Sequence, residues 1–380
     1  MHIGFLTPEY PHQETGKSGG LGTSIKNLAV GLRHEGIKVT VFVYGQSQQI
    51  IINDDGITLH LLRQKHYPLL NWLFYRKFLQ KYINAYIKQN RIDLIEAPDW
   101  TGITALMKLT KPVVIRLNGS DGYFCYLENR KQRFKNRFFE KQALKNADHL
   151  VSVSKFTAQV TKRIFKLEKP IEIIPNGIDV ASFKPDNTKI NGNEILYFGT
   201  IIRKKGLFEL AHVFNELVNL KAEVKLTLIG KDVEDFFEKR STIELFKRMI
   251  DDKNLDKIEW LGEMPYKDIS RRIARAQVVV LPSFAEALPM TWLEAMAKEK
   301  ALVTSNIGWA GEVMVHERTG FAIDPKNHKE FAVAIKKLLD DPQLAKQMGY
   351  NARRRVLEKF STEVTVKKNM ELYSQICHNS

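Results

Sequence analysis

Residues 171–185 read IEIIPNGIDVASFKP, a segment rich in turn-forming residues that divides the chain into two similar halves. On both sides of it, short β-branched runs alternate with helical patterns. Such strand–helix–strand repetition is typical of doubly wound parallel sheets. The chain has 380 residues, which is also too long for one ordinary hydrophobic core. We therefore predict an α/β protein with a domain at 1–180 and a second domain at 181–361.

Several predicted strands are nearly all apolar, as expected of parallel strands that are covered on both faces. They are 2–6, 38–44, 57–62, 92–98, 112–119 and 149–154 in the first half, and 194–199, 224–230, 258–262, 277–283 and 301–306 in the second. The apolar spacing of 24–36 predicts a helix that ends at Gly36. Ligands of such sheets bind at the carboxyl ends of the strands, so a cleft between the domains is the expected site.

The composition is that of a soluble globular protein, with 44% hydrophobic and 27% charged residues. No segment approaches the roughly 18 apolar residues of a membrane-spanning helix. The opening MHIGFLTPEY lacks the basic flank of a signal peptide and predicts a buried strand. Cys125 and Cys377 are too far apart in the sequence to form a metal motif. These features predict a cytoplasmic protein.

Positive charge is concentrated in the first half of the chain. Of the formal net charge of +15, residues 1–185 carry +12 and residues 186–380 carry +3. An excess of this size suits an anionic partner, namely nucleic acid, a membrane surface or an acidic substrate. A solvated surface that only keeps the protein in solution explains the charge equally well.

A glycine-rich loop, TGKSGGLGTSIKN (15–27), follows the first predicted strand. It is not a phosphate-binding P-loop, because Pro11 stands where that motif needs glycine, and its glycine spacing does not fit a dinucleotide fingerprint. Gly19 and Gly20 do precede a helix N-terminus, where free amides and the helix dipole favour an anion or a closely approaching ligand. A tight turn that requires glycine is the alternative.

A basic segment, FGTIIRKKGL (198–207), follows a predicted strand of the second half. Arg203, Lys204 and Lys205 lie beside Gly206, at the carboxyl end of a parallel strand. Cations at this place suit a diphosphate, arginine through paired hydrogen bonds and lysine through its point charge. A solvated loop is the alternative.

Two glutamates eight positions apart, Glu286 and Glu294, lie in SFAEALPMTWLEA (283–295). Pro289 fits the first turn of a helix, so we predict that the helix starts near 288–289 and that Glu286 precedes it. A helical path would separate the two Cα atoms by ~12 Å. Glycoside hydrolases hold their two carboxyl groups roughly 5–9.5 Å apart. The spacing therefore favours two ends of one extended ligand.

Two structural explanations of the same glutamates remain open. Ser283 and Glu286 have the spacing of a capping box. Glu294 has Lys298 four residues later, the spacing of an ion pair along a helix.

Taken in order, these motifs resemble glycosyltransferase family 4, whose members are retaining enzymes of the GT-B fold with two Rossmann-like domains facing across a cleft. The resemblance rests on the glycine pair, the segment ending at Lys205-Gly206, the hinge-like IPNGID (174–179) and the two glutamates. It extends to ADHLVSVSKFT (147–157), the Glu312 region in SNIGWAGEVM (305–314) and RTGFAIDP (318–325). It also implies that a C-terminal helix, about 362–380, packs back on the first domain.

The resemblance implies a role for each matching residue. Glu294 would accept hydrogen bonds from the ribose hydroxyls of a nucleotide, and Glu286 would hold the donor sugar. Lys205 would neutralise the diphosphate leaving group, without an obligatory metal or other cofactor. Gly19 and Gly20 would let the first domain approach the donor. The helix start would present the amides of Leu288, Met290 and Thr291 to the sugar or the diphosphate.

The chain departs from the family pattern at two positions. Thr200 stands where many members have arginine, and Arg203 is the predicted substitute. Asn118 stands where many members have histidine at the end of the fifth strand. Asparagine can bind a sugar hydroxyl but does not titrate, so no general-base role carries over to Asn118.

The resemblance implies a retaining glycosyltransferase of hexosyltransferase type. It would transfer a sugar from a nucleotide-diphosphate-sugar to a glycan or lipid-linked saccharide, in cell-surface polysaccharide or glycoconjugate synthesis. The alternatives are a nucleotide-sugar epimerase of the same fold and a non-catalytic sugar-binding protein. Asn118 weakens the first alternative, and the presence of Glu286, Arg203, Lys205 and Glu294 together argues against the second.

Two segments of the first domain are both basic and aromatic, 69–89 and 130–145. In the first, Leu70, Phe74, Phe78 and Tyr82 form an apolar stripe beside a second one of Tyr75, Leu79, Ile83 and Ile87. Both segments suit contact with an anionic membrane at its inner face, or with an anionic or lipid-linked glycan. Ordinary helices packed on the sheet are the alternative. No nucleic-acid-binding motif accompanies the charge.

Overall fold

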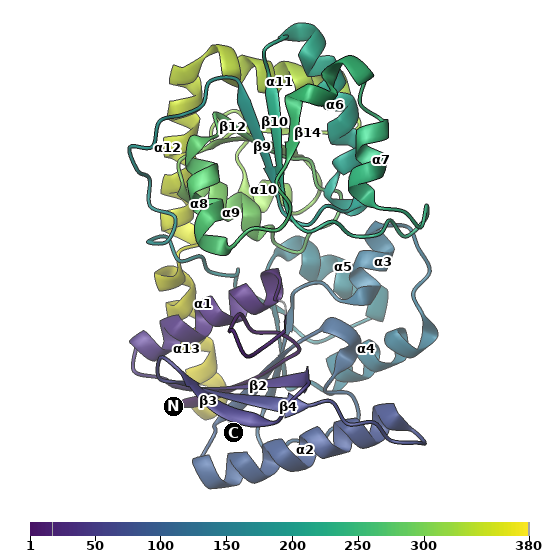
Figure 1. Cartoon of the computed structure of the whole chain (residues 1–380). Coiled ribbons are helices and arrows are strands. Elements are labelled where there is room, and N and C mark those ends of the chain that lie inside the picture. The colour runs from purple at the N-terminus through teal and green to yellow at the C-terminus, as the bar shows by residue number, and fades with distance from the viewer. Residues whose placement is uncertain (17, 379–380) are drawn as a thin grey trace. The chain divides into compact units, whose positions relative to one another are not determined.

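The computed structural model describes residues 1–16 and 18–378, which form two α/β units (Figure 1). Unit 1 comprises Met1–Ile178 and the C-terminal segment from Ser361, and unit 2 comprises Asp179–Phe360. The chain therefore leaves unit 1 after Ile178, builds unit 2 and returns. The observed change of unit lies two residues before the predicted boundary at residue 180.

Unit 1 contains an eight-stranded sheet of order β3-β4-β2-β1-β5-β6-β7-β8. Its strands are β1 (His2–Thr7), β2 (Lys38–Gln46), β3 (Ile50–Asp54), β4 (Ile57–Arg63), β5 (Leu94–Pro98), β6 (Val113–Leu117), β7 (His149–Ser152) and β8 (Glu172–Ile173). The sheet is parallel, as predicted, except at one edge. The edge strand β3 runs antiparallel to β4, and Asp55 and Gly56, both at positive φ, form the turn between them.

The helices of unit 1 cover both faces of this sheet. They are α1 (Gly20–His34), α2 (Asn71–Asn90), α3 (Asp121–Leu127), α4 (Phe134–Asn146), α5 (Lys155–Phe165) and α13 (Thr362–His378), with the 3₁₀ turn η1 (Trp100–Gly102). Successive side chains of β2 point to opposite faces, so Val41 and Val43 pack in the core that contains residues of α1 and α13. Phe42 packs in the core under α2.

Helix α1 differs from its predicted bounds of 24–36. It begins four residues earlier, at Gly20, and ends at His34, before the left-handed Gly36. Its middle packs closely on α13, since a Cβ atom at Gly31 would stand 2.4 Å from Val366 and 2.7 Å from Thr362. Only glycine permits this close packing, which fixes the C-terminal helix to unit 1.

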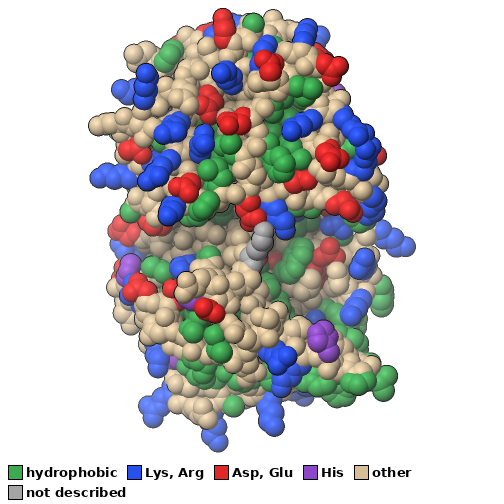
Figure 2. Space-filling view, in the orientation of Figure 1, with side chains coloured by type: hydrophobic (Ala, Val, Ile, Leu, Met, Phe, Trp, Pro, Cys, Tyr) green, Lys and Arg blue, Asp and Glu red, His purple; other side chains and the backbone are tan. Residues whose placement is uncertain are grey.

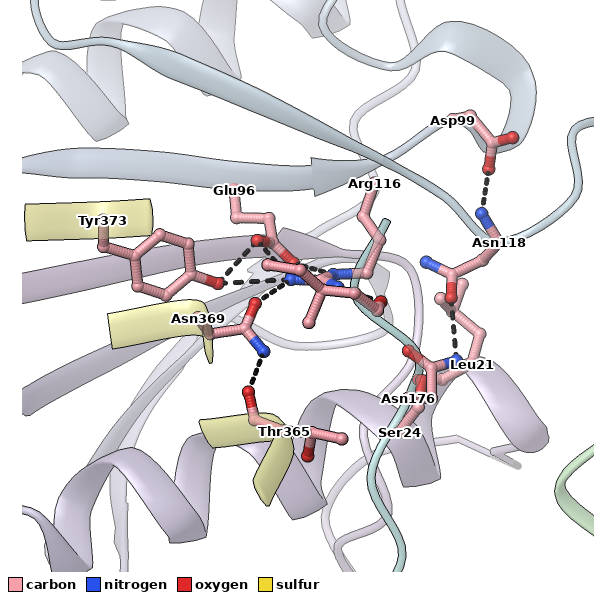
Figure 3. Close-up of polar contacts among 11 residues, drawn as sticks. Leu21, Ser24, Glu96, Asp99, Arg116, Asn118, Asn176, Thr365, Asn369 and Tyr373 are labelled. Atoms are coloured by element: carbon pink, nitrogen blue, oxygen red, sulfur yellow. Dashed lines mark hydrogen bonds and ion pairs between the residues drawn. The ribbon is translucent and has the colours of Figure 1, made fainter. Parts of the chain in front are cut away.

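A buried polar network also joins α13 to the sheet of unit 1 (Figure 3). Arg116 on β6 donates to both carboxylate oxygens of Glu96 on β5, from Nε at 2.6 Å and from Nη2 at 3.0 Å. The hydroxyl of Tyr373 donates to Glu96 Oε2 at 2.6 Å, and Arg116 Nη2 also reaches Asn369 Oδ1 at 2.5 Å. The network satisfies two buried charges, which would otherwise be costly.

Unit 2 contains a six-stranded, wholly parallel sheet of order β11-β10-β9-β12-β13-β14. Its strands are β9 (Glu194–Phe198), β10 (Lys225–Ile229), β11 (Ile258–Trp260), β12 (Val278–Leu281), β13 (Ala301–Ser305) and β14 (Phe321–Ile323). Its helices are α6 (Leu207–Leu220), α7 (Thr242–Arg248), α8 (Tyr266–Arg275), α9 (Met290–Ala297), α10 (Ala310–Val313), α11 (His328–Asp340) and α12 (Pro342–Lys359), with the 3₁₀ turns η2 (Arg203–Lys205) and η3 (Asp252–Lys257).

Two parallel-sheet α/β units of this kind are the predicted fold class. Among the residues described, no helix has both the length and the apolarity to cross a membrane.

Candidate active site

Two loops of unit 2 meet at the carboxyl ends of the neighbouring strands β9 and β12. The amide of Phe284 donates to the carbonyl of Lys204 at 2.8 Å, which joins the loop after β12 to the loop after β9. Gly206 has φ +76°, and a Cβ atom there would stand 2.0 Å from the carbonyl oxygen of Pro282. A glycine is therefore required for the two loops to pack this closely, and the packing brings the basic segment to the first glutamate.

Lys205 and Glu286 form an ion pair across these loops. Lys205 Nζ lies 2.6 Å from Glu286 Oε1, and the two side chains are 19% and 11% exposed. Because water is largely excluded, the attraction is stronger than for a surface pair. Tyr197, at the end of β9, lies fully buried, and burial together with the charge of Glu286 holds the pKa of its hydroxyl well above the ordinary value. The predicted sugar-binding and diphosphate-binding side chains are thus brought together.

Glu294 lies about one turn inside α9 and is buried. Its Oε1 accepts a hydrogen bond from the hydroxyl of Tyr266, the first residue of α8, at 2.8 Å. Burial raises the pKa of Glu294 to about 7, although the Tyr266 hydrogen bond and the charge of Lys205 both act to lower it. The carboxyl is therefore poised between its neutral and charged forms near neutral pH.

Glu286 pairs with Lys205, whereas Glu294 accepts its hydrogen bond from Tyr266. The proposed pair of Glu294 with Lys298 is wrong, because Lys298 Nζ contacts Asp186 and the carbonyl of Lys184, both at 2.7 Å. The proposed capping box is also wrong, because α9 begins well after Ser283 and its N-cap, Pro289, makes no side-chain capping bond.

The start of α9 differs slightly from the prediction. Pro289 is the N-cap, and the helix begins at Met290 instead of at 288–289. The first bonds that close the helix run from the amides of Trp292 and Leu293 to the carbonyl of Pro289. The amides of Met290 and Thr291 precede these bonds, so they lie at the positive end of the helix dipole. Both residues are half-buried, and Leu288 is buried.

Arg203 is engaged with a carboxylate that the sequence analysis missed. Its Nε and Nη2 donate to the two oxygens of Asp235 at 2.8 and 2.9 Å, and its guanidinium lies over the rings of Phe208 and Phe237. The hydrogen bond to Asp235 raises the pKa of Arg203 and lowers that of Asp235. Arg203 therefore reaches a diphosphate only if it shares or leaves this partner.

The glycine pair in unit 1 stands at the start of α1. Gly19 is the N-cap, Gly20 is the first helical residue, and both are exposed. Glu9, which follows β1, accepts a hydrogen bond from the amide of Gly22 at 2.8 Å. The structure thus places a carboxylate at the helix start where we expected an external anion. In the sequence, the sign of this contact is the position of Glu9, two residues after β1.

Asn118 follows β6 and forms part of a polar group in unit 1 (Figure 3). The backbone amide of Asn118 donates to Asp99 Oδ1 at 3.0 Å. The side-chain oxygen of Asn118 accepts a hydrogen bond from the side-chain amide of Asn176 at 3.1 Å. Burial and the nearby charge of Glu140 hold the pKa of Asp99 well above the ordinary value. The buried Asp99 carboxyl thus anchors the backbone that presents Asn118.

Tyr266 and Asp235 are the contacts that sequence reasoning could not find. Each lies about 30 residues from its partner in the chain, on another helix or loop, and neither forms part of a recognisable motif. Their proximity to Glu294 and Arg203 depends on the packing of unit 2.

Two family models match consecutive parts of the chain. Residues 18–182 match the model of Glycosyltransferase Family 4, and residues 181–355 match that of Glycosyl transferases group 1. An uncharacterized glycosyltransferase of Methanocaldococcus jannaschii is 25% identical, with 98% of each chain covered.

Solved structures show the same fold. Sucrose-phosphate synthase from Thermosynechococcus elongatus superposes with a TM-score of 0.82 at 20% identity, covering all of both chains. The Anabaena protein HepE, solved in complex with UDP-glucose, has a TM-score of 0.75 at 19% identity, covering 99% of this chain and all of HepE. With two family models that together span 18–355, the protein belongs to the group 1 glycosyltransferases of family 4 and has their GT-B fold.

Proposed function

We propose that the protein is a retaining hexosyltransferase that uses a nucleotide-diphosphate-sugar donor. The acceptor is a glycan or a lipid-linked saccharide of cell-surface polysaccharide or glycoconjugate synthesis. The observation that carries the proposal is the 2.6 Å ion pair of Lys205 with Glu286, which adjoins a helix start and a buried carboxyl, Glu294. Each group suits one part of such a donor.

The diphosphate is the part of the donor that needs positive charge. Lys205 and the first-turn amides of α9 supply it, because cations and helix N-termini both stabilise phosphate oxygens. In the unliganded protein Glu286 balances Lys205. When the diphosphate takes over as the partner of Lys205, Glu286 becomes available to a hydroxyl of the sugar.

The leaving group is a nucleoside diphosphate, so its developing charge must be stabilised as the bond to the sugar breaks. Lys205 is already held in place by Glu286 and needs no large rearrangement, which is the condition for effective electrostatic catalysis. We expect no obligatory metal ion. Glu294 accepts hydrogen bonds from the ribose hydroxyls, and the side-chain amide of Asn118 suits a sugar hydroxyl.

The experiment that tests the proposal begins with thermal shift against a panel of UDP-, GDP- and ADP-sugars. A donor that binds the folded protein raises the melting temperature by mass action. The stabilising donor is then incubated with EDTA-treated protein and candidate glycan and lipid-linked acceptors. We expect transfer with retention of the anomeric configuration, read by NMR. Failure of every nucleotide sugar to stabilise the protein would refute the proposal.

The same assay separates the alternatives. Conversion of the donor sugar in the absence of any acceptor would identify an epimerase. Stabilisation by a donor, without turnover for any acceptor, would favour the sugar-binding protein.

A further inference from the structure

Unit 1 carries a group of large apolar side chains that are open to solvent. At the start of α2 they are Leu69, Leu70 and Phe74, and at the start of α4 they are Phe134 and Phe138. Leu69 is 77% exposed and Phe134 is 84% exposed. Clusters of exposed apolar side chains in soluble proteins mark contact with a partner or a membrane. We call these five residues the apolar tips.

The two sets of apolar tips belong to one region of unit 1. The ring of Trp72 on α2 packs on that of Phe139 on α4, with 5.1 Å between centroids. The guanidinium of Arg76 lies over the ring of Phe139, 4.1 Å from its centroid, and also donates to the carbonyl of Trp72. The start of α2 is therefore fixed beside α4. Figure 2 shows hydrophobic side chains at the lower right of unit 1, where Figure 1 places these helices.

The two apolar stripes predicted on α2 differ in burial, and this difference explains why the tips of α2 are exposed to solvent. Tyr75, Leu79, Ile83 and Ile87 are buried in the core, and Phe78 and Tyr82 pack against it. The other predicted stripe extends beyond the sheet only at Leu70 and Phe74, so those two have no core to enter. Leu70 also adopts a left-handed conformation, with φ 48°, where the loop turns into the helix.

The segments that carry the tips are almost free of acidic residues. Residues 56–92 contain seven Lys or Arg and no Asp or Glu. Residues 129–147 contain seven Lys or Arg and one acid, Glu140. Glu140 is fully buried and accepts hydrogen bonds from the amides of Thr101, Asp121 and Gly122. Both segments are thus positively charged, and their net charges of +7 and +6 account for the whole excess in the first half of the chain.

The cations near the tips are also available. Arg130 has carboxylate partners in Glu128 and Asp121. Within the described residues, no ion pair joins Lys131, Arg133 or Lys135 to a carboxylate. These three lie directly before or beside Phe134 in the chain.

We propose that this surface of unit 1 docks on an anionic lipid bilayer. The apolar tips enter the boundary between headgroups and acyl chains, and the surrounding Lys and Arg contact the anionic headgroups. Bases can stack on the three phenylalanine rings, but Leu69 and Leu70 offer no ring, so the five tips together favour the acyl boundary of a bilayer over nucleic acid. The proposal deepens the proposed function and rests on it in one respect, since docking here would bring the enzyme to a lipid-linked acceptor.

The test is flotation of the full chain with vesicles of phosphatidylcholine alone and with phosphatidylglycerol added. We expect co-flotation only with the anionic vesicles, and weaker binding as salt is raised. The double variant Leu69→Ser/Leu70→Ser and the double variant Phe134→Ser/Phe138→Ser should each lower the partition coefficient about tenfold or more. Lys131→Gln/Arg133→Gln/Lys135→Gln should abolish the preference for phosphatidylglycerol.

Matched controls lie in unit 2. Val333 and Tyr350 are both 55% exposed, so Val333→Ser/Tyr350→Ser removes comparable apolar surface away from the apolar tips. This variant should float as the wild type does. Absence of flotation, equal loss in the control, or RNA binding by gel shift without vesicle binding would overturn the proposal. Thermal shift with the donor is measured on the same variants. A variant that loses flotation but is still stabilised by the donor shows that membrane docking and donor binding are tested separately.

Discussion

The hydroxyl of Tyr266 donates a hydrogen bond to Glu294 Oε1 at 2.8 Å. The ring of Tyr266 packs edge to face with that of Phe183, with 5.4 Å between the ring centroids. Phe183 belongs to the segment that leads into unit 2, and its carbonyl accepts a hydrogen bond from Arg353 on α12. One tyrosine thus links the buried carboxyl of the proposed donor site to the first residues of its unit. The protonation state of Glu294 is the property of this site that experiment tests most directly.

Nucleotide binding should weaken as the pH falls through neutrality. The pKa of Glu294 is about 7, and only the charged form accepts hydrogen bonds through both oxygens. Between about pH 8 and about pH 6 we expect the Kd for the nucleoside diphosphate to rise several-fold, approaching tenfold per pH unit below the pKa. Calorimetry at several pH values measures this. Glu294→Gln should bind more weakly with no such dependence, and an identical slope in that variant would assign the titration to another group.

Loss of the charge on Glu294 should stabilise the unliganded protein at alkaline pH. Its pKa is raised from 4.5 to about 7 on folding, so the folded state binds the proton more tightly than the unfolded state. The favourable contribution is complete below about pH 4.5 and is lost as the pH rises through about 7, a change of at most about 3 kcal/mol. Glu294→Gln should therefore unfold at higher urea concentration than the wild type at alkaline pH. Equal midpoints would show that the buried charge costs nothing.

Tyr266→Phe should move the midpoint of the nucleotide-binding profile to higher pH. The hydroxyl stabilises the charged form of Glu294, so its removal raises the pKa of the carboxyl. Phe183→Leu perturbs the packing of the same ring without touching the hydrogen bond and serves as the control. A uniform loss of affinity at every pH would mean that Tyr266 acts through packing alone.

Lys205→Ala and Glu286→Gln should separate diphosphate binding from transfer. Lys205→Ala should weaken binding of the nucleoside diphosphate but not of the free nucleoside, and should lower kcat roughly 100-fold. Glu286→Gln should bind the diphosphate at least as tightly as the wild type, because it removes the competing partner of Lys205. Its rate of transfer should fall sharply. If Glu286→Gln transferred sugar at the wild-type rate, the role of this carboxylate at the sugar would be wrong.

Arg203→Ala and Asp235→Asn should distinguish two roles for the guanidinium. If Arg203 contacts the diphosphate, Asp235→Asn frees it and tightens binding, while Arg203→Ala lowers activity. If Arg203 only fixes the loop through Asp235, both variants lower activity alike. We expect the first result. Titration of both variants with the nucleoside diphosphate, alongside kcat/KM, provides the measurement.

The sequence predicted the strands that build the site well, and the edges of the fold less well. Apolar runs followed by turn residues identify buried parallel strands, because both faces of the strand are covered. The edge strand β3 was missed, although the Asp-Gly turn after it was a readable signal. The short β8 and β14 were also missed, since two or three residues carry too little pattern.

The positions of the site residues were easier to predict than their partners. Pro289 placed Glu286 in a loop and Glu294 in a helix, because proline lacks the amide that a helix interior needs. The ion pair of Lys205 with Glu286 joins residues 81 positions apart and depends on the packing of two loops around Gly206. The hydrogen bond of Tyr266 and the ion pair of Asp235 likewise arise only when strands and helices are assembled.

The network around Arg116 has a consequence for the order in which the chain can fold. Glu96 and Arg116 are synthesised before unit 2, yet Asn369 and Tyr373, which complete their hydrogen bonds, are synthesised after it. Unit 2 is complete at Phe360, whereas unit 1 lacks a helix of its core until the residues after Phe360 have been synthesised. On the ribosome, unit 1 therefore begins before unit 2 but is completed after it, and a chain cut short before α13 would leave unit 1 open while unit 2 stands folded.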